Sequence, residues 1–131
     1  MQLKHARALF YVAAVFNLGA VVLLHPASGM AAALAVSPAP GSGVFDQIAL
    51  VAILAFGIGY WLVARDPDRN RDLVKIGMAA KLGVVAIVIA HFLTGSANAM
   101  LLLLVSGDLL FALAFLYFLK ARTPQAAAAL R

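Results

Sequence analysis

The stretch DLVKIGMAAKLGVVAIVIAHFL, residues 72–93, decides the fold of this chain because it is apolar over the length of a long helix. A helix needs about 20 consecutive, predominantly apolar residues to cross the hydrocarbon core of a bilayer, so the stretch predicts a transmembrane helix. Lys81 stands near its middle. A charged side chain at that depth needs a partner or a water-filled cavity, so we expect the rest of the chain to supply a partner for Lys81.

The composition of the whole chain agrees with a membrane protein. Of its 131 residues 65% are hydrophobic and 11% are charged, and the mean hydropathy is +1.01, whereas soluble domains are about 45–50% apolar and about 25% charged. Four apolar runs, at about 8–24, 47–64, 73–93 and 99–119, each have the length of a span. We therefore predict an all-α integral membrane protein, a single domain over residues 1–131 whose four transmembrane helices form an antiparallel bundle.

The positive charges predict the orientation of this bundle. Nine of the ten Lys and Arg residues, all except Lys81, lie before the first span, around the second connection or in the C-terminal tail. By the positive-inside rule, both termini and the second connection then face the cytoplasm. Anionic lipid headgroups are sufficient partners for the net charge of +5, so no nucleic acid is expected. We also expect an uncleaved anchor rather than a secretory signal cleaved near GMAAALA (residues 29–35), because the first apolar run is long and contains Asn17.

The partner predicted for Lys81 is Asp108. The third connection, TGSAN at residues 94–98, is short enough to force the third and fourth spans into a hairpin, and the two charged residues lie at similar distances from it along the chain. At 1.5 Å per residue, both fall about 20 Å below the outer edge of the bilayer. Asn17 lies within a turn or two of the same level, and Tyr60 is a looser candidate. This polar group is either structural glue that fixes helix register or a site that handles a ligand, ion or proton.

Small residues predict where helices pack closely. In the third span, four of them recur at spacings of four, three and four, which places them on one stripe roughly opposite Lys81: Ala79, Gly83, Ala86 and Ala90. Such stripes let helix backbones approach one another. We expect this face to meet another helix of the chain, a second copy in a homo-oligomer, or a membrane-protein partner.

A second set of candidate residues falls near the outer rim: His25, Asp46 and His91. These residue types are competent metal ligands, and the two histidines are possible haem ligands, although no pair has the spacing of a known ligand motif. Asp46 is equally explained as an N-cap at the start of the second span. The cofactor is therefore left open.

Catalytic motifs are absent from the sequence, which contains no Glu, no His-Glu-x-x-His, no Gly-x-Ser-x-Gly and no Walker loop. Cysteine is also absent, which excludes disulfides and thiolate chemistry. The sequence therefore lacks the motifs on which common hydrolases and nucleotide-binding enzymes depend, and a non-enzymatic protein is favoured.

Several stretches resemble small four-helix inner-membrane proteins of bacteria to which no activity is assigned. The resemblance spans most of the chain and rests on Asn17 and Gly19 in the first span and on FGIGYW, RDPDRNR, IGMAAKLG and SGDLLFALAF at residues 56–61, 65–71, 76–83 and 106–115. It implies a location in the bacterial cytoplasmic membrane. The chain differs from the small multidrug transporters, which are built around a glutamate in the first span.

The sequence leaves three functions open. The first is a protein that binds a hydrophobic or lipid-like ligand, or the spans of a partner, around the pair of Lys81 and Asp108. The second is a proton- or ion-coupled transporter in which Asp108 is the titrating group. The third, an intramembrane enzyme, is least favoured because one Asp and one Lys supply acid or base chemistry without a nucleophile or a metal.

Overall fold

The computed structural model describes residues 1–122 and contains four long helices. They are α1 (Leu3–Leu24), α3 (Val44–Arg65), α4 (Arg71–Leu93) and α5 (Ala99–Ala121). Each is long and apolar enough to cross a membrane, and at most 28% of its apolar span is buried inside the bundle. The all-α architecture with four candidate spans is therefore confirmed, and it indicates an integral membrane protein. The helices extend the predicted spans by up to five residues at their charged or polar ends.

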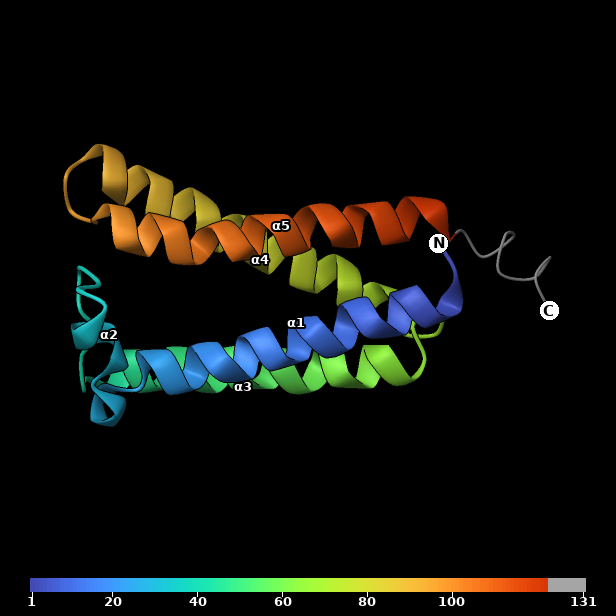
Figure 1. The fold of residues 1–131 in the computed structure, drawn as a ribbon, viewed down its shortest axis with the longest axis horizontal. Helices are drawn as coiled ribbons and strands as arrows, with labels where there is room; N and C mark the ends of the chain where they lie inside the picture. The colour runs from blue at the N-terminus through green and yellow to red at the C-terminus, as the bar shows by residue number, and fades with distance from the viewer. Residues whose placement is uncertain (123–131) are drawn as a thin grey trace.

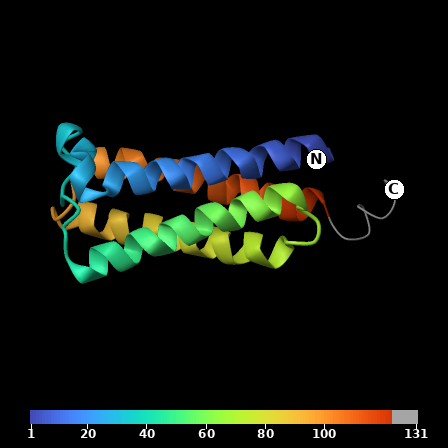
Figure 2. The ribbon, with the colours of Figure 1, turned by 90° about the horizontal axis from the view of Figure 1, so that it is seen from below.

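The four helices form two antiparallel pairs, α1 with α3 and α4 with α5 (Figure 1). We call the end of the bundle at which α1 begins and α5 ends the closed end, and the opposite end the open end. The two pairs approach each other at the closed end and diverge toward the open end (Figure 1). In the view turned by 90°, one pair lies over the other, with α1 along α5 (Figure 2). The bundle is thus a wedge rather than a parallel stack.

Aromatic side chains hold the two pairs together near the closed end. Phe10 of α1 lies 5.1 Å from Phe115 and 5.0 Å from Phe118 of α5, measured between ring centroids. Tyr60 of α3 lies 5.1 Å from Phe115. All four rings are buried, and tilted or edge-on aromatic contacts at these distances are favourable beyond the apolar area that they bury. This core fixes the hinge of the wedge.

A polar network covers this aromatic core at the closed end. Arg122 donates two hydrogen bonds to the carboxylate of Asp68, at 3.0 and 2.6 Å, and a third to the carbonyl of Met1 at 3.0 Å. Arg71 donates to the carbonyls of Leu119, at 2.8 Å, and of Arg122. The hydrogen bond with Asp68 raises the pKa of Arg122, so its charge is retained. Carbonyls at the end of α5 thereby find partners outside their own helix.

The long connection between α1 and α3 crosses the open end of the wedge (Figure 1). It contains a short 3-10 turn, η1 (Pro26–Ser28), and the short helix α2 (Met30–Ala33). Asn98, in the turn before α5, holds this connection: its backbone N–H donates to Ser37 at 2.9 Å and its side chain donates to Ala35 at 2.6 Å. Ser37 N–H donates back to Asn98 Oδ1 at 3.2 Å. The connection thus bridges the two helix pairs where they are farthest apart.

Candidate functional site

Lys81 lies at the centre of the bundle and contacts two polar residues from other helices. Its Nζ donates to Oδ1 of Asp108 on α5 at 2.5 Å and to Oδ1 of Asn17 on α1 at 3.1 Å. The Lys81 residue is only 4% exposed, and the side chain of Asp108 is 19% exposed. The charged pair predicted from the hairpin is therefore a buried ion pair, with Asn17 as its neutral third member.

Asn17 extends this contact to the remaining helix. Its Nδ2 donates to the backbone carbonyl of Ile53 on α3 at 3.2 Å. One polar chain thus runs from α3 through α1 and α4 to α5. Gly57 of α3 makes this approach possible, because a Cβ at that position would lie 3.3 Å from the Cβ of Asn17. The helices cannot rotate independently without breaking a hydrogen bond in a poorly hydrated region, where each unpaired polar group is costly.

Three aromatic rings surround the ammonium group of Lys81. Its Nζ lies 5.2 Å from the ring centroid of Phe16, 5.5 Å from that of Tyr60 and 5.4 Å from that of Phe111. A cation within about 6 Å of an aromatic face is attracted by the ring quadrupole, more strongly when it is desolvated. Gly107 admits Phe16 to this position, since a Cβ there would lie 2.7 Å from the ring. The aromatic rings and hydrogen bonds together offset the free-energy cost of removing the Lys81 ammonium group from water.

The four polar residues predicted from the sequence therefore meet at one place: Asn17, Tyr60, Lys81 and Asp108. Phe16 was not among the predicted residues. Phe16 directly precedes Asn17 in the sequence, so it lies at a similar depth in the span. An aromatic residue in an apolar span cannot be told from its lipid-facing neighbours by its residue type alone. Whether these residues bind a ligand stays a prediction.

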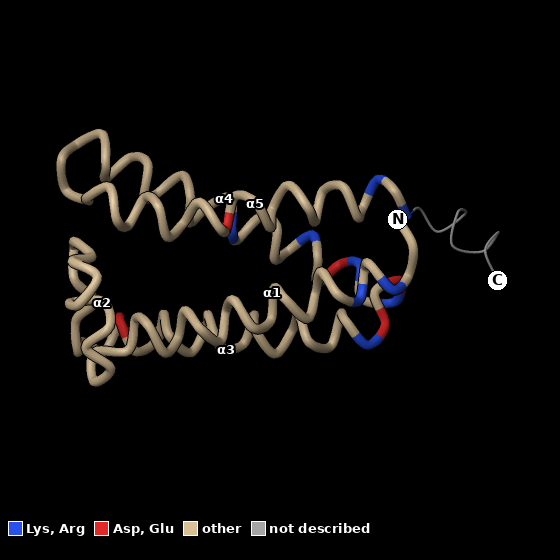
Figure 3. Tube along the Cα trace, viewed as in Figure 1, with Lys and Arg blue, Asp and Glu red and all other residues tan. Residues whose placement is uncertain are grey.

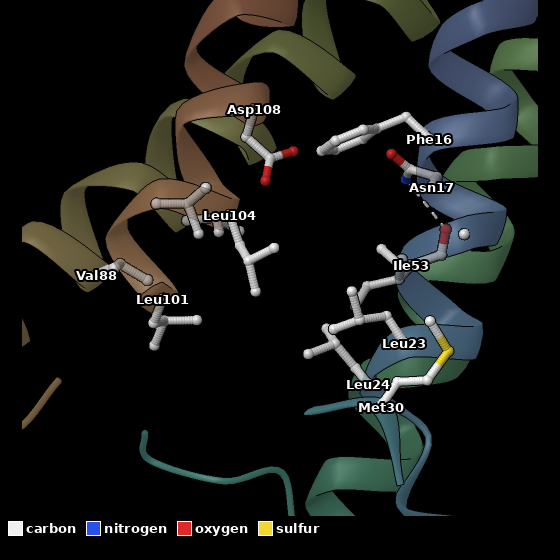
Figure 4. A pocket seen from close by; sticks show the side chains of 14 residues that line it. Phe16, Asn17, Leu23, Leu24, Met30, Ile53, Val88, Leu101, Leu104 and Asp108 are labelled. Atoms are coloured by element: carbon white, nitrogen blue, oxygen red, sulfur yellow. Dashed lines mark hydrogen bonds between the residues drawn. The ribbon is translucent and has the colours of Figure 1, made fainter. Parts of the chain in front are cut away.

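A cavity of about 460 Å³ opens between the two helix pairs on the open-end side of this polar group. Its walls are apolar, with Val88, Leu101 and Leu104 on one side and Leu23, Leu24, Ile53 and Met30 on the other (Figure 4). Asn17 and Asp108 line its inner end, where the carboxylate of Asp108 faces the ring of Phe16 (Figure 4). The sequence did not predict this cavity, because it depends on how far the pairs diverge.

No family model matches the chain, and no match is found among the curated proteins or the solved structures compared with it. Function is therefore inferred from the geometry of the site itself.

The rim residues do not form a comparable site. Within residues 1–122 no three His, Cys, Asp or Glu side chains gather closely enough to hold a metal ion, so His25, Asp46 and His91 are not brought together as a ligand set. The ring nitrogen Nδ1 of His25 instead accepts the backbone N–H of Ala27 at 3.2 Å. The alternative N-cap role of Asp46 is wrong, because α3 begins at Val44 and has Gly43 as its N-cap. Asp46 lies in the first turn, where its charge still faces the positive end of the helix.

The small-residue stripe of α4 faces outward rather than into the bundle. All four of its members are exposed in the structure: Ala79, Gly83, Ala86 and Ala90. The expectation that it packs against another helix of this chain is therefore wrong. Close approach is made instead by Gly57, Gly77 and Gly107, each of which faces a side chain of another helix within about 3.3 Å of where its Cβ would be. A contact between the stripe and a second chain stays a prediction.

Proposed function

We propose that this protein binds a hydrophobic, lipid-like ligand in the cavity between its helix pairs, with the polar end of the ligand at Asp108 and Asn17. The observation that supports this proposal is the meeting of an apolar cavity of about 460 Å³ with one polar group at its inner end. Ligand sites are commonly concave, mostly apolar and equipped with a few convergent polar groups, at volumes of about 300–1,000 Å³. A cavity with apolar walls and one polar end suits an amphipathic ligand, which has an apolar body and one polar group.

The surroundings of the cavity favour a ligand that arrives from the bilayer. Toward the closed end, the cavity stops at the rings around Lys81 and at the aromatic core behind them. At the open end, the connection held by Asn98 crosses between the pairs, and Met30 of α2 lines the cavity there. The sides between the diverging pairs remain as the path. Since the outer surfaces of the four helices are apolar and exposed, that path leads to lipid.

Filling the cavity is expected to abolish ligand binding. Leu104→Trp places a larger ring in the cavity, whereas Leu113→Trp adds the same ring on the outer face of α5, where Leu113 is 54% exposed. We expect a total lipid extract of the expression host to raise the unfolding temperature of the detergent-solubilised wild type and of Leu113→Trp by about 5 °C. Leu104→Trp should show no rise. A rise in Leu104→Trp equal to that of the wild type, or no rise in the wild type, would contradict the proposal.

We also infer that the protein lies in the cytoplasmic membrane of a bacterium with its closed end toward the cytoplasm. The support is the distribution of charge along the bundle, in which the Lys and Arg residues among residues 1–122, apart from Lys81, gather at the closed end (Figure 3). Of the charged residues in the part of the chain that the structure describes, Asp46, in the first turn of α3, lies near the open end (Figure 3). Positively charged residues that flank membrane spans remain preferentially on the cytoplasmic side.

Reporter tags test this orientation independently of any ligand. A tag fused at either end of the chain should report the cytoplasm, and a tag inserted at Ser42, in the connection before α3, should report the outside. Ser42 is exposed, so an insertion there leaves the packed core intact. A cytoplasmic signal from the Ser42 insertion in cells that express full-length protein would contradict the proposed orientation.

A further inference from the structure

The polar end of the cavity is selective in what it can bind. We propose that it accepts an uncharged hydroxyl group, so that the ligand is a single-chain apolar alcohol; this inference rests on the ligand-binding function proposed above.

Asp108 offers an acceptor to the cavity. Its Oδ1 accepts from Lys81, while its Oδ2 has no hydrogen-bond donor among residues 1–122. The side chain is 19% exposed and lines the cavity. An ionised carboxylate only accepts hydrogen bonds, so a ligand group that binds Oδ2 must carry a hydrogen. A hydroxyl that donates to a carboxylate makes a charge-assisted hydrogen bond, which is stronger than a bond between neutral groups.

Asn17 offers a donor beside this acceptor. Its Oδ1 accepts from Lys81 and one N–H of its Nδ2 donates to Ile53, which fixes the orientation of the amide and leaves the second N–H without an acceptor in the described chain. The Asn17 and Asp108 side chains both contact Nζ of Lys81 and line the same end of the cavity, with the ring of Phe16 between them (Figure 4). A hydroxyl both donates and accepts. It can therefore donate to Asp108 or accept from Asn17, whereas an ether or a ketone oxygen can only accept and so cannot bind Asp108.

The charge of the site excludes ionised ligands. Lys81 and Asp108 neutralise each other at 2.5 Å, so any charge on the ligand would be uncompensated in an apolar cavity. A carboxylate ligand would also face the free oxygen of Asp108. It would find no ammonium donor, because Lys81 is not among the residues that line the cavity: two of its three N–H groups donate to Asp108 and Asn17, and three rings enclose the ammonium group.

The volume of the cavity limits the apolar part of the ligand. A cavity of about 460 Å³ lies toward the lower end of the range of about 300–1,000 Å³ that small-ligand sites occupy. A single alkyl or isoprenoid chain of that size fits. A two-chain phospholipid is several times larger and does not fit, so it would have to leave most of its mass outside between the helix pairs.

Matched probes of one chain length test this assignment: lauryl alcohol, lauryl methyl ether and laurate. Each is titrated into the wild-type protein in one detergent, with concentration expressed as mole fraction in the micelle and the unfolding temperature as the readout. We expect lauryl alcohol to reach half of its stabilising effect at a concentration about tenfold lower than either of the other probes. The methyl ether isolates the donated hydrogen, because it keeps the oxygen and the chain.

The outcomes separate this inference from the proposed function. Equal potency of the ether and the alcohol, or greater potency of laurate, would overturn the hydroxyl assignment while the cavity remains a ligand site. No stabilisation by any probe or by the lipid extract would overturn both. In the double variant Lys81→Met with Asp108→Leu, the preference for alcohol over ether should disappear, whereas Leu113→Trp should keep it. If the double variant does not fold, the ratio measured on the wild type still decides.

Discussion

Replacement of Lys81 by Met, or of Asp108 by Leu, is expected to lower the free energy of unfolding by about 3 kcal/mol in each single variant. Each replacement leaves the other charge buried without its partner, and the wild-type contact of 2.5 Å leaves no room for water between the two groups. Asn17 can satisfy one hydrogen bond of a stranded Lys81 but not its charge. Reversible unfolding in mixed micelles, followed by circular dichroism, measures the loss.

The double variant should recover much of that loss. A desolvated ion pair exchanged for apolar packing of similar volume is often neutral in stability or better, so Lys81→Met with Asp108→Leu is expected to unfold close to the wild type. The wild type, the two single variants and the double variant form a double-mutant cycle, which isolates the coupling between the two side chains. Additive losses, with no coupling, would contradict the buried pair.

The chain contains a matched control for this cycle. Lys75 and Asp72 also form an ion pair, at 2.7 Å, but their side chains are 60% and 89% exposed. Exposed pairs are screened by water and contribute little, so Lys75→Met with Asp72→Leu should show no measurable coupling. A coupling as strong as that of Lys81 and Asp108 would mean that burial is not the cause of the effect.

The cycle also separates the structural role of the pair from a role in binding. If the pair is only glue, the double variant should keep the response to lipid extract that the wild type shows, because the apolar side walls of the cavity are unchanged. If Lys81 instead holds Asp108 in position to bind the ligand, the double variant should be stable and should lose the preference for a hydroxyl. Stability and ligand preference thus report on different functions of the same two residues.

The contact between Lys81 and Asp108 could be predicted because it depends on chain geometry alone. A short turn at residues 94–98 forces adjacent antiparallel helices, and residues at similar distances from such a turn lie at one level. The cost of an isolated charge in the bilayer then selects the oppositely charged neighbour. Asn17 was predicted from its depth by the same reasoning, and the hydrogen bond of 3.1 Å from Lys81 agrees with it.

The wedge and its cavity could not be predicted because they depend on side-chain packing between helices that are distant in sequence. The divergence of the pairs is set by contacts such as Phe16 on Gly107 and Tyr60 on Gly77. Hydropathy does not separate a lipid-facing side from a helix-facing side in a span that is apolar all around. The outward stripe at Ala79 and Gly83 illustrates this limit, since small residues suit a helix contact and a lipid contact equally well.

Gly77→Ala is expected to destabilise the bundle by about 1–3 kcal/mol, because the site is already filled. A Cβ at Gly77 would lie 2.5 Å from the hydroxyl oxygen of Tyr60 and 2.6 Å from its Cε1. Tyr60 is 1% exposed and packs against Phe115, so its ring has little room to withdraw. The new methyl group must therefore push α4 away from α3 near the hinge of the wedge. Unfolding in mixed micelles measures the change.

Gly83→Ala is the matched control on the same helix, six residues away. A Cβ there would meet nothing within 4 Å, and its φ is that of ordinary helix. Alanine is a better helix former than glycine by about 0.5–1 kcal/mol, so this variant should be neutral or slightly more stable than the wild type. Adding Tyr60→Leu to Gly77→Ala removes the ring that causes the clash, so the second substitution should cost less in that background than in the wild type. If Gly77→Ala and Gly83→Ala behave alike, Tyr60 does not pack on Gly77, and the helix pairs meet differently at the hinge.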